Sequence, residues 1–365
     1  MAERLHLIPA SQWGLFPLSR PMVIAGPCAA ESEEQLWKTA EGIVAAGICV
    51  FRAGIWKPRT HPGGFEGVGT PGLRWLQKIR REYGLKVCTE VACARHVDEC
   101  TAHGLDMVWI GARTTANPFL VQEIADALRG ADIPVLVKNP VSPDLDLWIG
   151  ALERLNQAGV RKLGAVHRGF SSWQRLPYRN QPGWRIAIEM KTLYPELPFF
   201  ADPSHMAGER KYLRELSQRA MDLGLEGLMI ESHCNPDQAL SDAGQQLTPE
   251  ALRTMLTEQI VVREPDSQEP DYQDNIKQLR ARIDAIDESL IALIRSRMTL
   301  SEKIGHYKKD HNIAVLQTAR WDDLMEQVIW KGNTEGLEPR FLQALFNVIH
   351  EESIRIQNNI LWSKE

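Results

Sequence analysis

The sequence contains no long apolar run. No stretch of about 18 apolar residues, the length that a membrane-spanning helix needs, occurs in its 365 residues. The first residues, MAERLHLIPASQW, also lack the apolar core of a secretory signal peptide. The sequence therefore argues against membrane insertion and secretion, and it predicts a cytoplasmic protein.

Cysteine is scarce and the net charge is small. The cysteines show no zinc-site spacing and are too few for a disulfide scaffold, so most are expected to be reduced core residues. The six are Cys28, Cys49, Cys88, Cys93, Cys100 and Cys234. The net charge is −5 and no long basic run is present, which argues against a nucleic-acid partner.

Apolar runs alternate with helical patterns from Met22 to about Thr257. The helical patterns, such as EEQLWKTAEGIVAAG and PFLVQEIADALRGA, each end at glycine or another small residue. The runs predicted as buried parallel strands are residues 22–27, 48–54, 86–91, 107–112, 134–139, 162–168, 198–203 and 227–232. These strand–helix repeats predict a closed (β/α)8 TIM barrel of the α/β class, with ligand bound at the carboxyl ends of the strands.

The stretch from Phe199 to Asp242 carries the first candidate site. Its pattern predicts a strand, a loop, a helix from Glu209 to Gly224, a second strand and a second loop. His205 and Glu231 then lie at one edge of the sheet, and Asp242 follows in the next loop. With Cys28 after the first strand, this mixed set suits Mn, Fe, Co or Zn better than Mg or Ca. The alternative is that these are ordinary polar residues at loop ends.

The other strand ends carry charged side chains, most of them cationic. The cations are Arg52, Lys57, Arg59, Arg113, Lys138 and Arg168, and Thr60 and Glu90 lie at the same rim. Arginine binds phosphate and carboxylate through two parallel hydrogen bonds, whereas lysine acts as a point charge. So many cations exceed the need of one phosphate, which predicts two phosphorylated substrates or one with an added carboxylate. Ion pairs with neighbouring carboxylates are the alternative for any single cation.

A different architecture follows the barrel pattern. Residues 261–273, VVREPDSQEPDYQ, predict a polar linker between a barrel domain at 1–260 and an all-α domain at 274–365. Apolar residues spaced by three and four from Ile276 to Tyr307 predict a helix of about 40 residues with a heptad seam. Shorter helices are predicted at 318–331 and 338–361. Because these cannot bury the seam, we expect a homodimer or a larger homo-oligomer.

Cationic and polar side chains recur in this helical domain. Arg297 interrupts the apolar seam and shares a face with Lys308, while Ser353 and Gln357 are one turn apart on the last helix. Arg280 points about 100° around the first helix from Arg297, as expected if it serves a partner's site. Buried cations in a bundle indicate an anionic ligand, and a coiled-coil oligomerisation module with a specificity arginine is the alternative.

Several rim motifs are those of a known family. The motifs AGPCAAES, FRAGIWKPRT, WIGAR, DPSH, and IES followed by ALSD resemble the β-type class I 3-deoxy-D-arabino-heptulosonate 7-phosphate (DAHP) synthases over roughly residues 20–258. The resemblance implies a metal-dependent condensation of phosphoenolpyruvate with erythrose 4-phosphate, the first step of the shikimate pathway to aromatic amino acids. It also implies a divalent metal, with Mn expected first and Co, Fe or Zn as alternatives.

The resemblance assigns roles to the rim residues. As metal ligands it implies Cys28, His205, Glu231 and Asp242. As phosphoenolpyruvate ligands it implies Arg52, Lys57, Arg113, Lys138 and Arg168, and for the sugar phosphate it implies Arg59 and Thr60. Lys57 is the candidate catalytic proton donor, and Glu90 is expected to border the substrates.

The tail has its own resemblance. Over residues 274–362, LRARID, IRSR, IGHYKK and EESIRIQ resemble the all-helical chorismate mutases, which convert chorismate to prephenate. The implied binding residues are Arg280 (acting across the dimer), Arg297, Lys308, Arg320, Ser353 and Gln357, with Arg297, Lys308 and Gln357 as the catalytic ones. Gln317 and Trp321 stand where acidic residues are common in that family.

The resemblances together predict a bifunctional enzyme, a synthase followed by a mutase. Three alternatives stay open: a tail that binds prephenate or chorismate as a sensor without catalysis, a tail that is a purely structural dimerisation module, and a barrel that condenses phosphoenolpyruvate with another sugar. Since no separate sensor domain is evident, we expect prephenate or chorismate to inhibit the barrel through the tail.

Overall fold

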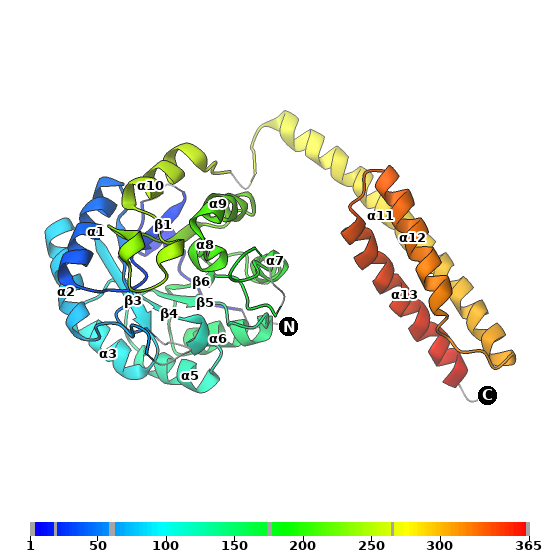
Figure 1. Ribbon diagram of the computed structural model, residues 1–365, viewed down its shortest axis with the longest axis horizontal. Coiled ribbons are helices and arrows are strands. Elements are labelled where there is room, and N and C mark those ends of the chain that lie inside the picture. Colours follow the sequence, from blue (N-terminus) through cyan, green and yellow to red (C-terminus); the bar gives the residue numbers. More distant parts are fainter. Residues whose placement is uncertain (1–3, 18–19, 58–62, 174–176, 264–265, 363–365) are drawn as a thin grey trace. The chain divides into compact units, whose positions relative to one another are not determined.

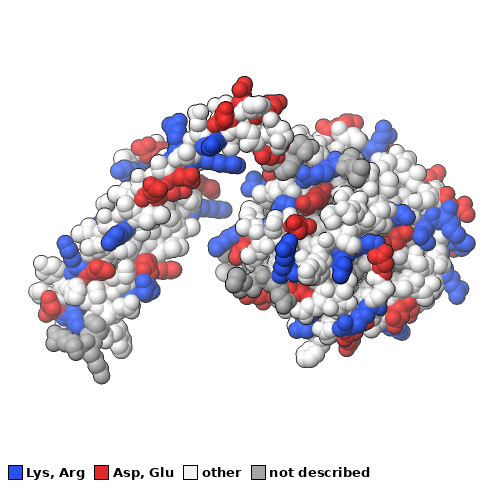
Figure 2. Space-filling model, turned by 180° about the vertical axis from the view of Figure 1, so that it is seen from behind, with Lys and Arg blue, Asp and Glu red and all other residues white. Residues whose placement is uncertain are grey.

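The structure is a computed structural model that describes residues 4–17, 20–57, 63–173, 177–263 and 266–362. The chain divides into two compact units, one up to residue 265 and one from residue 266 (Figure 1). None of the helices in the described part has the length and hydropathy that membrane crossing requires. Figure 2 shows positive and negative side chains interspersed over each unit.

The first unit is the predicted barrel. All neighbouring strands are parallel, and the order β1 to β8 closes when β8 pairs with β1. The strands are β1 Met22–Gly26, β2 Val50–Arg52, β3 Lys86–Val91, β4 Met107–Ile110, β5 Val135–Lys138, β6 Leu163–His167, β7 Phe199–Ala201 and β8 Gly227–Glu231. Because Gly26 is in register with Glu231, the carboxyl ends of the first and last strands lie side by side.

Helices surround the strands, as Figure 1 shows. They are α1 Glu33–Ala45, α2 Pro71–Tyr83, α3 Ala94–Ala102, α4 Ala112–Thr115, α5 Pro118–Ala127, α6 Leu145–Gln157, α7 Trp184–Leu193, α8 Pro203–Ala207, α9 Leu213–Asp222 and α10 Pro249–Thr254. Local sequence explains where several begin. Ser32 caps α1 by accepting a hydrogen bond from the Gln35 amide, and Asp144 caps α6 in the same way at Leu147.

The helix predicted from Glu209 to Gly224 is divided in the structure. The short helix α8 precedes it, a 3-10 turn at Arg210–Tyr212 follows, and α9 begins only at Leu213. Asp202 caps α8 by accepting a hydrogen bond from the His205 amide at 3.1 Å. His205 therefore lies on a capped helical turn, not in an open loop as the sequence pattern predicted.

The interior of the barrel is filled and closed at its amino end. Inward side chains such as Ile24, Trp109 and Phe200 form one buried cluster. Trp13 joins this cluster from the segment before β1, and Phe16 of that segment packs against Phe200 with ring centroids 5.6 Å apart. A second, larger cluster lies between the strands and the surrounding helices. Ligand access is consequently at the carboxyl ends of the strands.

The second unit consists of three helices, as predicted. They are α11 Pro270–Asp310, α12 Thr318–Thr334 and α13 Pro339–Trp362, so α11 begins within the stretch expected to be linker. The helix α13 packs closely along the second half of α11. A Cβ atom at Gly305 would lie 2.9 Å from Ile360 Cδ1 and 3.3 Å from Gln357 Cα, so a side chain here would force the helices apart.

The heptad seam of α11 is left uncovered by the described residues of the helical unit. Leu279, Ile286 and Leu293 are 52%, 59% and 67% exposed, whereas Ser301 and Gly305 are buried under α13. The two shorter helices thus pack on a different face from the seam. This leaves a long apolar stripe on one side of α11, as the sequence pattern predicted.

Candidate active sites

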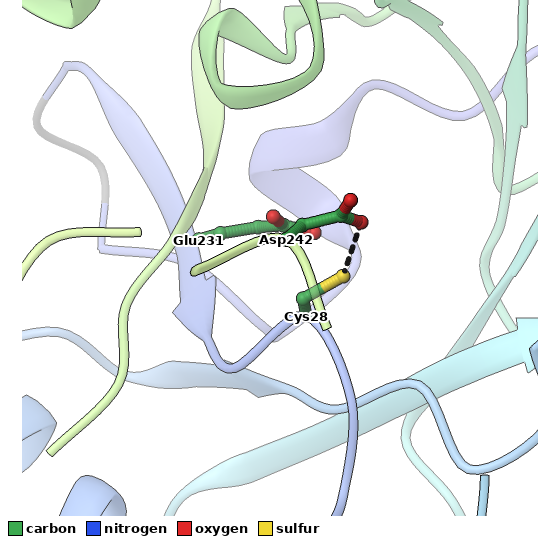
Figure 3. Close-up of side chains that lie close together, drawn as sticks. All are labelled: Cys28, Glu231 and Asp242. Carbon is green, nitrogen blue, oxygen red and sulfur yellow. Dashed lines mark hydrogen bonds between the residues drawn. The ribbon is translucent and has the colours of Figure 1, made fainter. Parts of the chain in front are cut away.

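Three side chains of the predicted metal set meet at the carboxyl end of the barrel. Cys28, Glu231 and Asp242 each offer a ligand atom within 4.8 Å of the others (Figure 3). The Cys28 thiol donates a hydrogen bond to Asp242 Oδ2 at 3.0 Å. The fourth predicted ligand, His205, lies beside them, with Nε2 3.6 Å from Glu231 Oε1. The structure therefore brings Cys28, from the start of the barrel, beside three residues from its last two repeats.

The environment of these four groups is that of a metal site. Burial raises the pKa of Cys28 to about 12, and the nearby charge of Glu231 acts in the same direction. Burial also opposes ionisation of Glu231 and Asp242, but neighbouring cations outweigh it and lower the pKa of both carboxyls. Burial lowers the pKa of His205, which favours the neutral imidazole that a metal needs. A thiol, an imidazole and two carboxylates match the preferences of Mn, Fe, Co and Zn.

Asp202 orients His205. Its Oδ2 lies 2.8 Å from His205 Nδ1, which leaves Nε2 directed at Glu231. A carboxylate behind a ligating imidazole is the common arrangement in metal sites, because it fixes the ring and its tautomer. The same oxygen accepts a hydrogen bond from Lys138 Nζ at 2.6 Å. Asp202 is part of the DPSH motif but was not among the predicted site residues, and its place three residues before the histidine was the available signal.

Arg52 and Lys138 both lie over the Trp109 ring. The Arg52 guanidinium lies 4.8 Å and the Lys138 ammonium 5.7 Å from the centre of the Trp109 ring, a cation–π arrangement. Arg52 also lies 3.2 Å from Glu231 Oε1. Trp109 donates its indole hydrogen to Glu90 Oε2 at 3.2 Å, which places Glu90 at the same rim. The sequence pattern gives no signal for Trp109, since nothing distinguishes it from other inward residues of an apolar strand.

The remaining predicted rim residues lie nearby, with two exceptions. Lys57 Nζ donates to Cys28 Sγ at 3.0 Å, and the charges of Cys28 and Glu231 overcome burial to raise the pKa of Lys57. Burial lowers the pKa of Arg168, at the end of β6, to about 10. Arg113 lies on α4, directly after β4. Arg59 and Thr60, predicted for the sugar phosphate, lie outside the described residues.

The helical unit brings together four of its six predicted residues. Arg297 donates hydrogen bonds to Ser353 Oγ and to the Ile349 carbonyl, so α11 and α13 are joined at this point. Lys308 donates to the Val315 carbonyl in the turn before α12. Gln357 is buried, and its Oε1 has no hydrogen-bond partner among the described residues. Two cations and a buried unpaired acceptor form a polar cluster on α11 and α13, suited to an anion with a hydroxyl or ether group.

The other two predicted residues are not buried with this cluster. Arg320 and Arg280 are both exposed. Arg280 is seventeen residues before Arg297 on one straight element, about 25 Å along the helix axis. Trp321, one of the departures from the expected pattern, stacks on His350 with ring centroids 4.0 Å apart. An indole that stacks on an imidazole therefore stands at the position where the family commonly has a carboxylate.

The first unit is thus a TIM barrel in which a candidate metal-ligand set lies beside buried cations at the carboxyl ends of the strands. Residues 19–264 match the family model described as the DAHP synthetase I family, and the chain belongs to this family. Residues 279–358 match the model described as chorismate mutase type II. The chain is accordingly a DAHP synthase barrel fused to a C-terminal chorismate mutase domain, with both activities.

Individual relatives agree with the family match. A phospho-2-dehydro-3-deoxyheptonate aldolase of Thermotoga maritima is 30% identical over 236 residues, which is 65% of this chain and 68% of the relative. The crystal structure of the Thermotoga maritima DAHP synthase superposes with a TM-score of 0.58 at 30% identity and covers 67% of this chain and 68% of that one. A 2-dehydro-3-deoxyphosphooctonate aldolase of Nitratidesulfovibrio vulgaris is 29% identical over 66% of this chain and 91% of the relative.

Proposed function

We propose that the rim residues named above carry the condensation of phosphoenolpyruvate with erythrose 4-phosphate. Carbon 3 of phosphoenolpyruvate forms a bond to the aldehyde carbon of the sugar, water adds at carbon 2, and inorganic phosphate leaves. The observation that supports this assignment is the convergence of Cys28, His205, Glu231 and Asp242 beside buried Lys138 and Arg168.

The four converging side chains would hold a divalent ion, Mn first, with Co, Fe or Zn as alternatives. When bound, such an ion supplies Lewis-acid polarisation of a carbonyl oxygen. Arg113, Lys138 and Arg168 hold the phosphate of phosphoenolpyruvate, and Arg52 holds its carboxylate through two parallel hydrogen bonds. Arg59 and Thr60 are proposed for the phosphate of the sugar.

Lys57 is the proposed proton donor to the new alkoxide oxygen. It lies 3.0 Å from Cys28 Sγ and so borders the metal set. Its pKa is raised because the charges of Cys28 and Glu231 outweigh burial, so it carries the proton that the reaction requires. Glu90, accepting from Trp109, borders the same space.

In the helical unit we propose that the polar cluster on α11 and α13 binds chorismate and favours its rearrangement. The ether C–O bond breaks as a C–C bond forms within one molecule, so no residue needs to form a covalent bond. Arg297, together with Ser353 and with Arg320 and a partner's Arg280, holds the carboxylates and hydroxyl. Lys308 and Gln357 stabilise charge on the ether oxygen by preorganised electrostatics.

We also propose that this unit forms a homodimer, or a larger homo-oligomer, through the seam of α11. The exposed residues Leu279, Ile286 and Leu293 form a stripe that a second copy would cover. A partner also accounts for Arg280, which lies about 25 Å along α11 from Arg297 of its own chain. A cytoplasmic location is proposed, since sparse unpaired cysteines suit a reducing compartment.

An activity assay of the purified chain tests these assignments. Phosphoenolpyruvate and erythrose 4-phosphate should react only when metal is present, and chorismate should be consumed with or without chelator. Because an octonate relative is 29% identical, five-carbon sugar phosphates should be screened beside the four-carbon one. Faster turnover of a five-carbon sugar would replace the proposed substrate. Binding of prephenate without chorismate turnover would make the tail a sensor.

Feedback control is the last part of the proposal. Prephenate or chorismate bound in the tail would inhibit the barrel, with a coupling of about 1–3 kcal/mol, or roughly 5–150-fold in apparent substrate affinity. Synthase activity of residues 1–265 and of the full chain, each titrated with prephenate, decides the matter. Inhibition confined to the full chain would support coupling through the tail, and equal inhibition would place the effector site on the barrel.

A further inference from the structure

The chain just before α7, at residues 177–182, is anchored beside the proposed metal set. It is closed at its base by two hydrogen bonds between the backbones of Phe170 and Gln181, both 2.8 Å long. The buried His167 ring contacts the Pro182 carbonyl through Nε2 from the side between strands and helices. These contacts fix the backbone next to Arg179 and Asn180, which belong to none of the motifs named above.

The backbone of these two residues pairs with the helix that carries His205. The Arg179 amide donates to the Ala207 carbonyl and the Asn180 amide to the Met206 carbonyl, both at 3.1 Å. Gly208 ends that helix with φ +71°, and a Cβ atom there would lie 2.5 Å from Arg179 Cβ. Only glycine permits this contact, so the segment and the helix are held together.

The Arg179 side chain contacts one carboxylate of the proposed metal set and the amide that holds a second. Its NH1 donates to Asp242 Oδ1 at 2.8 Å and to Gln245 Oε1 at 3.0 Å. Gln245 in turn donates from Nε2 to Glu231 Oε2 at 2.6 Å. One guanidinium thus orients one acidic ligand directly and a second through an amide.

The Asn180 side chain connects the metal set with the phosphate cations. Its Oδ1 accepts a hydrogen bond from Arg168 NH1 at 2.9 Å, and its Nδ2 donates to the His205 carbonyl at 2.6 Å. Asn180 is 7% exposed, so loss of its amide would leave these partners unpaired in a buried place.

We propose that Arg179 and Asn180 are positioning residues that join the metal ligands and the phosphate cations into one rigid site. The inference rests on the proposed function, because it takes the four ligands and Arg168 in their proposed roles. Arg179 also places a positive charge near a cation site, which opposes metal binding. Since its side chain is 46% exposed, solvent screens that charge, and the orientation of two carboxylates is the larger effect.

Titration of the metal-stripped full chain with Mn²⁺, with free Mn²⁺ measured by electron paramagnetic resonance, tests the role of Arg179. Arg179→Met should weaken binding about 10–100-fold, as loss of outer-shell partners commonly does, and Arg179→Lys should fall between it and the parent. Arg129→Met is the matched control, since Arg129 makes an exposed ion pair with Asp126 after α5. The control should bind Mn²⁺ like the parent, and the melting temperatures of all three variants should be similar.

Asn180→Ala supplies an independent readout. It should weaken Mn²⁺ binding and raise the KM for phosphoenolpyruvate together, each about 10-fold, because one amide holds both groups. Unchanged or tighter Mn²⁺ binding by Arg179→Met would overturn the positioning role while leaving the proposed function intact. A parent protein that neither binds Mn²⁺ nor condenses the two substrates would overturn the proposed function, and this inference with it.

Discussion

The two units assemble their candidate sites in opposite ways. In the barrel, Cys28, Lys138 and Glu231 are buried, and their partners come from the same chain. In the helical unit, Arg297 and Lys308 are only half-buried, and Arg280 is exposed far along the helix. The described residues of the candidate barrel site thus come from one chain, whereas the proposed mutase site needs a second copy.

The difference follows from topology. A closed sheet has no edge, so the register of eight strands fixes which carboxyl ends are neighbours, as with Gly26 and Glu231. A long helix can pack only one side against two shorter ones, and the opposite apolar side of α11 stays exposed. The barrel therefore buries its charged groups when its sheet closes, and a three-helix unit of this shape would bury them when two copies associate.

Metal removal should separate the two activities most sharply. Stripping the metal should lower synthase activity at least about 1000-fold, because Lewis-acid stabilisation amounts to several kcal/mol, while mutase activity should not change. Mn, Co or Zn should each restore some synthase activity. Rates of both reactions in chelator-treated protein provide the measurement, and full synthase activity after verified metal removal would contradict the prediction.

Arg297→Leu should remove mutase activity and spare synthase activity. Loss of this guanidinium should lower mutase activity about 100–1000-fold and leave the synthase unaffected, as expected for one preorganised electrostatic group. Leucine suits the heptad seam, so thermal stability of the helical unit should be equal or higher. Steady-state rates and calorimetry are the measurements. A large loss of stability with normal mutase rates would show that Arg297 is structural.

Acid should weaken the barrel more modestly. Burial lowers the pKa of His167 to about 4 from an ordinary value near 6.5, so the unfolded chain binds this proton more readily. Stability contributed by neutral His167 is complete above pH 6.5 and is lost as the pH falls toward 4. At pH 4.5 the loss should be about 2–3 kcal/mol.

Denaturant unfolding of the barrel at pH 7 and pH 4.5 measures this loss. His167→Asn should be less stable at pH 7 but should lack the part of the pH dependence that His167 contributes. An identical pH dependence in the parent and the variant would show that other groups are responsible.

The sequence by itself determined the fold class and the elements that carry both sites. Alternation of apolar runs with helical periods specified eight strands, and parallel strands must end at one edge, which placed His205 and Glu231 together. The spacing on α11 likewise placed Arg297 and Lys308 on one face, and the spacing on α13 placed Ser353 one turn from Gln357. These are consequences of local repeat lengths, which a single sequence contains.

Only the tertiary structure decided which side chains support the site. Trp109 pairs in register with Glu90, and that pairing brings its ring beneath Arg52 and Lys138. Arg179 and Gln245 come from loops with no periodic pattern, and their contacts depend on how two separate segments fold over the rim. A repeat length states which face a residue occupies but not what lies opposite it, because that depends on closure of the barrel and on the paths of its loops.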